Sequence, residues 1–250
     1  MKLSVIIITK NAGATIRRCL ESVAWADETI VVDSGSTDDT ETICRDLGVQ
    51  WTAYSDWPGF GPQKNRALDL ATGDWVFSID ADEWVAPELH TEMLAIISAD
   101  NPVHAYAVPR CSSFCGRFMK HSGWWPDYVV RLFRRDCARF SEDQAHERLI
   151  VTGATHKLRQ PLMHEAISDM DQMIGKMNLY SSASARSLHA RGRRASIWTA
   201  LFHGSWAFFR TYILRRGFLD GREGFILAIA NAEGSYYRYI KLMLESEKVR

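Results

Sequence analysis

Strand and helix signals alternate through the first hundred residues, and this alternation limits the folds that the chain can adopt. Short apolar runs rich in Val, Ile and Trp are separated by turns and by stretches with apolar residues at helical spacing. We expect strands at residues 5–9, 29–32, 51–54 and 75–79, and helices at residues 16–23, about 38–47, 63–71 and 87–99. Parallel neighbours need a helical crossover, so the pattern predicts an α/β fold with a mostly parallel sheet flanked by helices.

The pattern changes beyond residue 100. Two further strands are expected at residues 105–110 and 128–133, between loops rich in Gly, Trp and His, and loops of this kind commonly carry binding residues. From about residue 166 the chain becomes helical, basic and aromatic. We therefore divide it into residues 1–165, with halves of about 1–100 and 101–165, and a helical C-terminal extension of residues 166–250.

A formal net charge of zero hides an asymmetry along the chain. Residues 181–250 contain 12 Lys and Arg against 5 Asp and Glu, and no acidic residue occurs from Gln172 to Leu219. Such a basic block predicts an anionic partner surface. The five cysteines show no paired C-x-x-C spacing, which favours free thiols in a reducing compartment. The N-terminus predicts a first strand and no signal peptide.

Three aspartates follow predicted strands. Asp80 and Asp82 come after the apolar run 75–79, and Asp33 ends the run 29–32. Carboxylates suit Mg²⁺ or Mn²⁺, which often complete their shells with substrate phosphates. Because ligands gather at the carboxyl ends of strands in open α/β sheets, the three side chains are expected to share one crevice. The alternatives are a solvated turn at Asp80 and Asp82 and an Asx turn at Asp33.

Four motifs occur in an order that resembles the family 2 glycosyltransferases. They are SVIIITKN at residues 4–11, VVDSGSTD at 31–38, QKNRA at 63–67 and DADE at 80–83. The resemblance implies a GT-A (nucleotide-diphospho-sugar transferase-like) fold for residues 1–165, with a nucleotide-sugar half at about 1–100 and an acceptor half at about 101–165. It also implies a nucleotide-sugar donor, a UDP-hexose, and a divalent cation, Mg²⁺ or Mn²⁺.

The same resemblance assigns roles to residues at the strand ends. Asp33 stands where the family accepts the uracil N3–H, and Thr9 and Asn11 stand where it lines the nucleoside pocket. Asp80 and Asp82 occupy the D-x-D position that approaches ribose and metal-bound diphosphate. The resemblance therefore predicts that Asp80 and Asp82 hold the cation.

Further candidates lie near the diphosphate and the metal. Lys64 and Arg66 would neutralise the leaving diphosphate, and a helix beginning near Gln63 would offer free N–H groups to it; the alternative is that both are ordinary solvated helix residues. His164 is a candidate third metal ligand, as in some GT-A enzymes. The alternative is a satisfied surface or core histidine.

An inverting transfer needs a carboxylate that takes the proton from the attacking acceptor hydroxyl. The segment at residues 141–149 falls where family members carry this base, and its His146-Glu147 pair resembles a subgroup that modifies lipopolysaccharide core. We favour Glu147, with Asp143 second. The alternative is that Glu147 pairs with Arg131 or Arg134 and only organises the site.

The same subgroup is resembled at three more places. WWPD at residues 124–127 and RLFRR at 131–135 make Trp124, Trp125 and Arg131 acceptor-site candidates, with core packing as the alternative for the indoles. GFLDGREGF at residues 217–225 resembles a box near the end of the subgroup, whose members include an inner-core β-1,4-glucosyltransferase. The resemblance thus extends over almost the whole chain.

The C-terminal extension contains an apolar stretch at residues 197–214. It is too short and too interrupted for a membrane span, which takes ~20 apolar residues. Five of its large side chains recur at helical spacing, which favours a helix lying on an anionic membrane surface: Trp198, Phe202, Trp206, Phe209 and Ile213. The alternative is packing on the first domain or on a second subunit of a homo-oligomer.

Together these features predict a metal-dependent inverting glycosyltransferase that moves glucose from UDP-glucose onto a lipopolysaccharide inner-core heptose. We expect it in the cytoplasm, peripheral on the cytoplasmic face of the inner membrane, with no nucleic-acid partner. One alternative is transfer to polyprenyl phosphate, O-antigen or capsule precursors. The other is a non-catalytic scaffold that binds nucleotide sugar or membrane.

Overall fold

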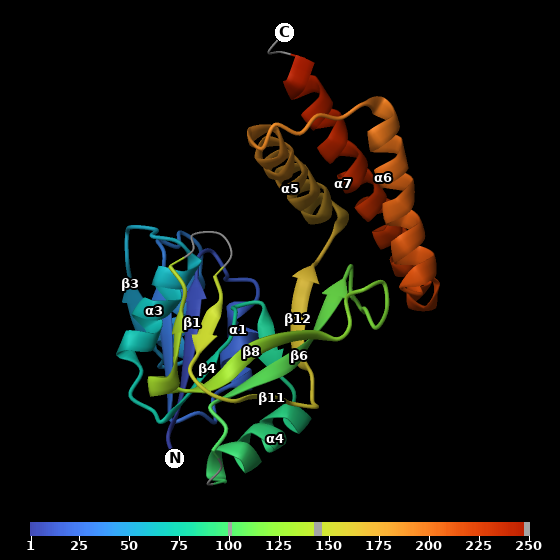
Figure 1. The fold of residues 1–250 in the computed structure, drawn as a ribbon. Helices are drawn as coiled ribbons and strands as arrows, with labels where there is room; N and C mark the ends of the chain where they lie inside the picture. The colour runs from blue at the N-terminus through green and yellow to red at the C-terminus, as the bar shows by residue number, and fades with distance from the viewer. Residues whose placement is uncertain (100–101, 143–146, 248–250) are drawn as a thin grey trace. The chain divides into compact units, whose positions relative to one another are not determined.

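The structure, a computed structural model, describes residues 1–99, 102–142 and 147–247 (Figure 1). The chain forms two compact units. The first contains residues 1–110 and 127–164, and the second contains residues 111–126 and 165–250. Residues 111–126, which we expect from the sequence in the acceptor half, thus belong to the second unit.

A mixed sheet forms the centre of the first unit (Figure 1). Four strands run parallel in the order β3-β2-β1-β4: β1 (Leu3–Thr9), β2 (Glu28–Asp33), β3 (Gln50–Ala53) and β4 (Trp75–Ser78). The order continues β8-β6-β12-β5, with β8 antiparallel to both β4 and β6. These strands are β5 (Glu83–Val85), β6 (Ala105–Phe114), β8 (Asp127–Arg134) and β12 (Leu162–Ile167), and the short β11 (Thr155–Lys157) pairs with β6.

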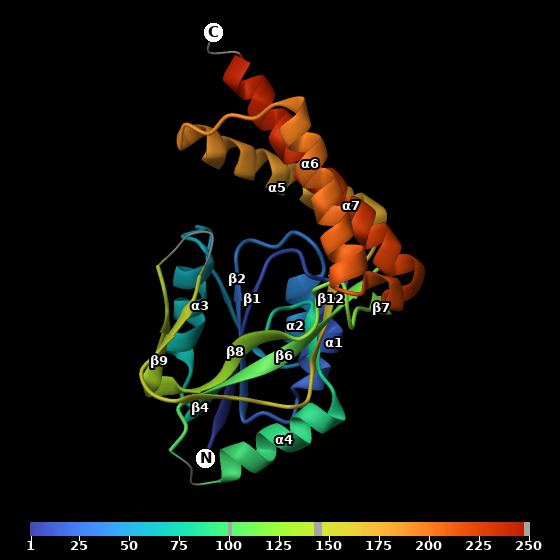
Figure 2. The ribbon, with the colours of Figure 1, turned by 45° about the vertical axis from the view of Figure 1, so that its right-hand side comes forward.

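Side-chain alternation along β1 divides the core into two layers. Leu3, Val5 and Ile7 pack with buried residues of α1 (Ile16–Ser22), α2 (Thr40–Asp46) and α4 (Pro87–Ser98). Ile6 faces the other way and packs with α3 (Phe60–Leu70). Figure 2 shows α3 on one side of the sheet and α1 and α2 on the other. This arrangement leaves the carboxyl ends of the parallel strands free for a site.

The structure differs from the expected elements at several points. Helix α3 begins at Phe60, and the N–H of Gln63 already donates to the Gly59 carbonyl at 3.1 Å. The expectation of free N–H groups at Gln63 is therefore wrong. Glu83 lies in β5, a strand outside the expected set, which forms by pairing antiparallel with β12. A separate two-stranded sheet joins β9 (Ala138–Phe140) to β10 (Leu149–Val151).

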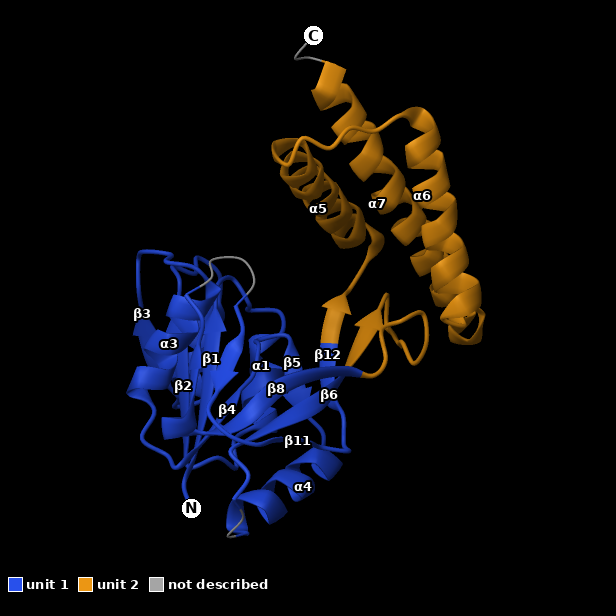
Figure 3. Ribbon diagram, viewed as in Figure 1, with its two compact units in different colours: residues 1–110, 127–164 blue, residues 111–126, 165–250 orange. Residues whose placement is uncertain are grey.

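The second unit is mainly helical (Figure 3). Helix α7 packs against both α5 and α6. Gly204 permits the close approach of α6 and α7, since a Cβ there would lie 3.3 Å from the Ala232 carbonyl oxygen. The helical elements are α5 (Met170–Ala190), α6 (Ile197–Phe209), a π-helical turn (Arg210–Leu214), a 3-10 turn (Gly217–Asp220) and α7 (Gly221–Glu247). None of the described helices is both long and apolar enough to cross a membrane.

Candidate active site

Thr9 and Asp33 end two neighbouring parallel strands. They are register partners at the carboxyl ends of β1 and β2, and Asp80 follows the adjacent β4. The Thr9 hydroxyl is buried and has no hydrogen-bond partner among the described residues. Because buried polar groups are normally satisfied, this hydroxyl is suited to bind a ligand at the strand edge.

The Asp33 carboxylate organises the turn that follows β2. Its Oδ2 accepts hydrogen bonds from the N–H groups of Gly35 and Ser36, each at 2.8 Å, and its Oδ1 accepts from the Ser36 hydroxyl. Gly35 has a φ of 81°, which glycine adopts without strain. Asp33 therefore forms the Asx-type turn that is the alternative for this residue. Its uracil contact stays a prediction.

Asn11 joins the loops after β1 and β2. Its backbone has a φ of 52°, its Oδ1 accepts from the Thr37 N–H at 2.8 Å, and its own N–H donates to the Ser36 hydroxyl at 2.8 Å. Asparagine tolerates this left-handed conformation better than most residues. Asn11 thus holds together the two loops that flank Thr9.

Lys64 of α3 contacts two of the carboxylates expected in the site, those of Asp80 and Glu147. Its side chain is 8% exposed, and its Nζ lies 3.1 Å from Asp80 Oδ1 and 3.1 Å from Glu147 Oε1. Glu147 therefore lies beside the D-x-D segment, and its ion pair is with Lys64, neither with Arg131 nor with Arg134 as the alternative supposed. Asp143, the second candidate base, lies outside the described residues.

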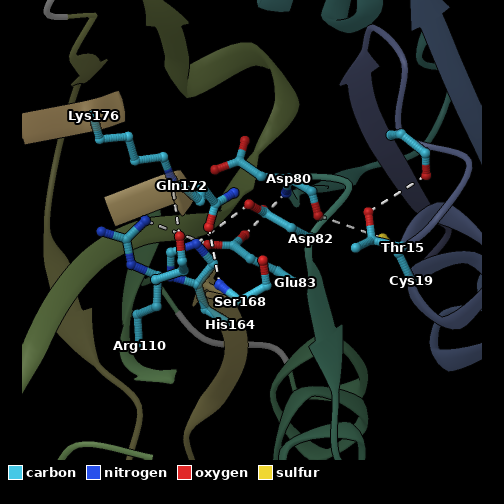
Figure 4. A network of polar contacts seen from close by, with 12 residues as sticks. Thr15, Cys19, Asp80, Asp82, Glu83, Arg110, His164, Ser168, Gln172 and Lys176 are labelled. Atoms are coloured by element: carbon cyan, nitrogen blue, oxygen red, sulfur yellow. Dashed lines mark hydrogen bonds and ion pairs between the residues drawn. The ribbon is translucent and has the colours of Figure 1, made fainter. Parts of the chain in front are cut away.

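Arg131 and Glu83 also hold Asp80 in place, and Figure 4 shows Glu83 next to Asp80. The Arg131 guanidinium binds Asp80 Oδ2 and lies 2.6 Å from Glu83 Oε1. Glu83 has a side chain that is 0% exposed, and its Oε2 accepts the Asp80 N–H at 2.9 Å. Arg131, which we expect at the acceptor, is thus engaged in fixing Asp80. Arg110 supports the same cluster from 3.5 Å.

The charges of this cluster depend on one another. Burial opposes ionisation of Asp80, but the adjacent Arg131 and Lys64 outweigh it and hold the pKa of Asp80 below its ordinary value. Burial raises the pKa of Glu83 above its ordinary value despite Arg131. Burial also disfavours the charged Arg131, yet Asp80 and Glu83 raise the pKa of Arg131. Both oxygens of Asp80 are therefore committed to cationic side chains.

Asp82 and His164 approach each other at the start of β5. His164 lies in β12 opposite Glu83, and its Nε2 is 3.5 Å from Asp82 Oδ2. The Asp82 side chain is 42% exposed and that of His164 is 15% exposed, so a ligand can reach the carboxylate. Among the described residues no three His, Cys, Asp or Glu side chains form a metal-binding group. The expected trio of Asp80, Asp82 and His164 is therefore not assembled as one group.

The donor atoms of this pair are compatible with a divalent cation. Carboxylate oxygens suit Mg²⁺ and Mn²⁺, and Mg²⁺ is commonly held by one or two carboxylates plus substrate phosphates. Asp82 fits this pattern because, among the described residues, its carboxylate contacts the His164 ring and makes no ion pair with a lysine or arginine. His164 would add a nitrogen ligand to the carboxylate of Asp82. The pair would thus need substrate oxygens to complete a coordination shell.

Arg66 is engaged outside this cluster. Its guanidinium makes hydrogen bonds of 3.1 Å and 2.7 Å to Asp56 and of 3.0 Å to Gln63 Oε1, and it lies over the Tyr54 ring at 4.4 Å. The bidentate pair with Asp56 is the geometry that arginine prefers. The structure therefore gives Arg66 a role in holding the loop before α3. Its contact with a diphosphate stays a prediction.

Two neighbours of Lys64 have structural roles that the sequence did not reveal. Gln63 donates to the Ser34 hydroxyl at 3.0 Å, which joins α3 to the turn after β2. Asn65 exchanges two hydrogen bonds with the Phe140 backbone, at 2.9 Å and 3.0 Å. Both polar side chains are buried in an otherwise ordinary helix. The motif QKNRA, in which consecutive polar residues interrupt the apolar spacing, is the signal that could have indicated these roles.

The expected acceptor tryptophans belong to the second unit. Trp124 is partly buried and contacts Phe114 edge-to-face, with ring centroids 6.0 Å apart. The preceding loop is fixed by Asp220, which accepts from the backbone N–H groups of Lys120 and His121 at 3.1 Å each and from the Ser122 hydroxyl at 2.8 Å. Trp125 is half-buried and precedes Pro126. The GFLDGREGF box therefore positions the loop that carries both indoles.

Comparison with known proteins now defines the family. Residues 4–158, more than half of the chain, match the family described as glycosyl transferase family 2. The chain belongs to glycosyl transferase family 2. An uncharacterised glycosyltransferase of Rickettsia prowazekii (strain Madrid E) is 32% identical over 96% of this chain and 86% of its own length. The family assignment made from the four motifs is confirmed.

One further relative and one solved structure are similar to this family 2 protein. The lipopolysaccharide core biosynthesis glycosyltransferase LpsC of Rhizobium meliloti (strain 1021) is 29% identical over 97% of this chain and 92% of its own length. The crystal structure of S. aureus TarS 1-349 in complex with UDP superposes with a TM-score of 0.52 at 17% identity, covering 100% of this chain and 92% of that one. The second likeness shows the fold, which is the expected GT-A fold.

Proposed function

We propose that this family 2 protein is an inverting glycosyltransferase that moves glucose from UDP-glucose onto a heptose of the lipopolysaccharide inner core. The observation that carries the proposal is the contact of Lys64 with both Asp80 and Glu147, each at 3.1 Å. It joins the D-x-D segment to the candidate base. The acceptor class is supported by the relative LpsC, whose name places it in lipopolysaccharide core biosynthesis.

The donor nucleoside is assigned to the edge formed by β1 and β2. The unpartnered Thr9 hydroxyl and the buried Asp33 lie side by side in the β1–β2 register. Asn11 joins the loops that follow β1 and β2, because its Oδ1 accepts a hydrogen bond from the Thr37 N–H. The similarly folded TarS was crystallised with UDP, which supports UDP as the nucleotide here.

A divalent cation is assigned to Asp82 and His164 together with the donor diphosphate. When bound, the cation would supply positive charge against the negative charge that develops on the diphosphate as the sugar leaves. Asp80 keeps Lys64 and Arg131 in place beside this position. Lys64, in turn, adds a second cationic group close to the leaving group.

Glu147 is assigned as the base. As the acceptor oxygen forms its bond to the anomeric carbon, the bond from that carbon to the diphosphate oxygen breaks, and the hydroxyl proton passes to the Glu147 carboxylate. Lys64 orients this carboxylate through the 3.1 Å contact. The electron pair of the broken bond leaves with UDP, so attack and departure on opposite faces give inversion.

The second unit is assigned to the anionic surface of the inner membrane, on its cytoplasmic face. Helix α6 and the following turns expose large apolar side chains next to a basic block: Trp198, Leu201, Phe202, Trp206, Phe209, Ile213, Leu214, Phe218 and Leu219. Amphipathic surfaces of this composition bind the interface between headgroups and acyl chains. Membrane contact would place the transferase beside a glycolipid acceptor.

The test is product analysis with defined acceptors. Purified protein, UDP-glucose and Mn²⁺ are incubated with core oligosaccharide from a strain lacking the gene, and mass spectrometry is expected to detect addition of one hexose to a heptose. Polyprenyl phosphate serves as the competing acceptor, and a product found only there would replace the lipopolysaccharide assignment. Absence of transfer and of UDP release with every acceptor and donor would favour the non-catalytic scaffold.

A further inference from the structure

A cavity of about 360 Å³ lies within the second unit. The loop at residues 122–124, helix α6, the π-helical turn and α7 all contribute to its wall. Three of the residues that line it are arginines, Arg210, Arg215 and Arg238, and none of its described lining residues is acidic. All of these elements belong to one compact unit, so the cavity belongs to that unit alone.

The arginines of this cavity differ from those that make ion pairs with carboxylates elsewhere in the described protein. Arg66, Arg131 and Arg139 each make a short ion pair with an aspartate. Within the part of the chain that the structure describes, no carboxylate pairs with Arg210, Arg215 or Arg238. Three like charges around one cavity repel each other unless an anion lies between them.

Two details describe how Arg238 and Arg215 are placed. The Nε of Arg238 is buried and has no hydrogen-bond partner among the described residues. Arg215 lies directly over the backbone of Gly123, because a Cβ on Gly123 would come within 2.4 Å of its Nη1. Gly123 itself has a φ of 83°. The buried, unsatisfied donor is a position for an acceptor oxygen from a ligand.

The remaining polar groups of the cavity suit an oxyanion. His203, Asn231 and Ser235 line the same space and supply further hydrogen-bond donors. Guanidinium groups bind phosphate in a planar, bidentate manner, and such charged hydrogen bonds are stronger than neutral ones. The donor set thus matches the tetrahedral oxygens of a phosphate.

An apolar row leads to this cavity along α6. Trp206 lines it and is 45% exposed, while Phe202 and Trp198, one and two helical turns away, are 68% and 76% exposed. Residues four apart lie on one helix face. We propose that the cavity binds the phosphate group of an anionic amphiphile, whose acyl portion contacts this row. The assignment of the phosphate to a membrane amphiphile rests on the membrane contact proposed above, whereas the binding of a phosphate by the cavity does not.

The proposal is tested by binding, without use of the transfer reaction. Arg210→Gln, Arg238→Gln and the double variant are compared with Arg193→Gln, which removes the same charge from an exposed loop of the same unit. Co-sedimentation with phosphatidylcholine vesicles containing phosphatidic acid is measured beside pure phosphatidylcholine vesicles. We expect the affinity for the anionic vesicles to fall about tenfold or more in the cavity variants and less than about twofold in the control.

A second arm identifies the source of the phosphate. Inorganic phosphate is titrated into each protein by calorimetry, and circular dichroism verifies that every variant remains folded. Loss of vesicle binding in the cavity variants, with or without a parallel loss of phosphate binding, supports the proposal. Equal loss in Arg193→Gln would show that charge alone drives binding and would overturn it. Unchanged vesicle binding in a folded double variant would also overturn the proposal. This holds even if that variant has lost the binding of free phosphate.

Discussion

Lys64 shows how one side chain can organise a site. An isolated lysine that is 8% exposed would be costly, because charged groups lose their hydration on burial. Here Asp80 and Glu147 surround its Nζ at equal distances of 3.1 Å. Removal of either carboxylate would leave the lysine partly unpaired, so effects on structure must be separated from effects on chemistry.

Glu147→Gln separates the two effects, because it keeps the shape and one hydrogen-bond acceptor but cannot take a proton. We expect kcat for glucosyl transfer to fall about 10²- to 10⁴-fold, with UDP-glucose binding nearly unchanged. Steady-state kinetics and donor titration measure the two quantities. Glu142→Gln, an exposed carboxylate five residues earlier, is the matched control and should remain active. Full turnover by Glu147→Gln would remove it as the base.

Asp82 carries the expected dependence on a divalent cation. Its exposed carboxylate has no lysine or arginine ion pair in the described structure, so its replacement should mainly affect the cation. We expect transfer to be lost in EDTA and restored by excess Mn²⁺ or Mg²⁺ in the wild-type protein, but not in Asp82→Ala. Asp46→Ala, on the far end of α2, is the control. Full wild-type activity in EDTA would contradict the metal assignment.

Glu28 provides a pH-dependent contribution to stability. Burial opposes its ionisation, but hydrogen bonds from Ser4 and Thr72 lower its pKa to about 2. Because the pKa of Glu28 is lower in the folded state, its ionised carboxylate stabilises the fold at pH values above the unfolded-state pKa of ~4.3. This stabilisation is lost as the pH falls from ~4.3 towards 2. At neutral pH the contribution of Glu28 to the free energy of unfolding is on the order of 3 kcal/mol, since its side chain is only 17% exposed and is little screened by solvent.

We therefore expect Glu28→Gln to be less stable than wild type at pH 7 and to approach it as the pH falls below 4. Urea unfolding at a series of pH values measures the difference. Glu21→Gln, whose side chain is 58% exposed, should follow the wild-type curve. A constant difference between Glu28→Gln and wild type from pH 7 to pH 3 would contradict the assigned pKa.

At the scale of elements, helix α3 holds the site together. Successive residues from Gln63 to Arg66 contact the turn after β2, the acidic cluster, β9 and the loop at residue 56. Its first turn also approaches the chain after β9 so closely that only glycine fits. A Cβ on Gly61 would lie 1.8 Å from the Ser141 carbonyl oxygen.

Gly61→Ala should therefore lower stability by about 3 kcal/mol and reduce activity, because backbone must move to admit the methyl group. Thermal unfolding followed by circular dichroism measures the change. Gly175→Ala is the control, since Gly175 lies inside α5 with open space around it. There the alanine should stabilise the helix by about 0.5–1 kcal/mol. Equal melting temperatures for the two variants would refute the close approach at Gly61.

At the scale of the whole molecule, charge is distributed unequally along a chain with no net charge. Residues 181–250 contain 12 basic and 5 acidic residues. They belong to the unit that also exposes the apolar row of α6. Attraction between this unit and an anionic surface is screened by salt, whereas the hydrophobic contribution is not.

Binding to vesicles that contain phosphatidylglycerol should therefore weaken strongly between 50 mM and 500 mM salt. Co-sedimentation at several salt concentrations measures it. Trp198→Ser with Phe202→Ser should weaken binding at every salt concentration, because it removes apolar contact but no charge. The matched control is Tyr180→Ser, an exposed aromatic on α5. Salt-independent binding would exclude the electrostatic contribution.

The sequence by itself determined the parallel half of the sheet and the carboxylates at its edge. Strand periodicity and turn residues are local signals, so β1, β2 and β4 and the placement of Asp33 and Asp80 after them follow from short windows. Ordered motifs also identified the family, which the match over residues 4–158 confirmed. The short strands β5 and β12 were missed, because each is stable only through its partner.

Only the tertiary structure decided which charges meet. Lys64 and Glu147 are 83 positions apart, and their contact depends on how α3 packs beside the segment after β9. No local pattern shows that Glu83 is buried against Arg131, or that arginines of the π-helical turn and α7 share one cavity. Such groupings arise from packing between distant segments, whereas periodicity records only which face of an element is apolar.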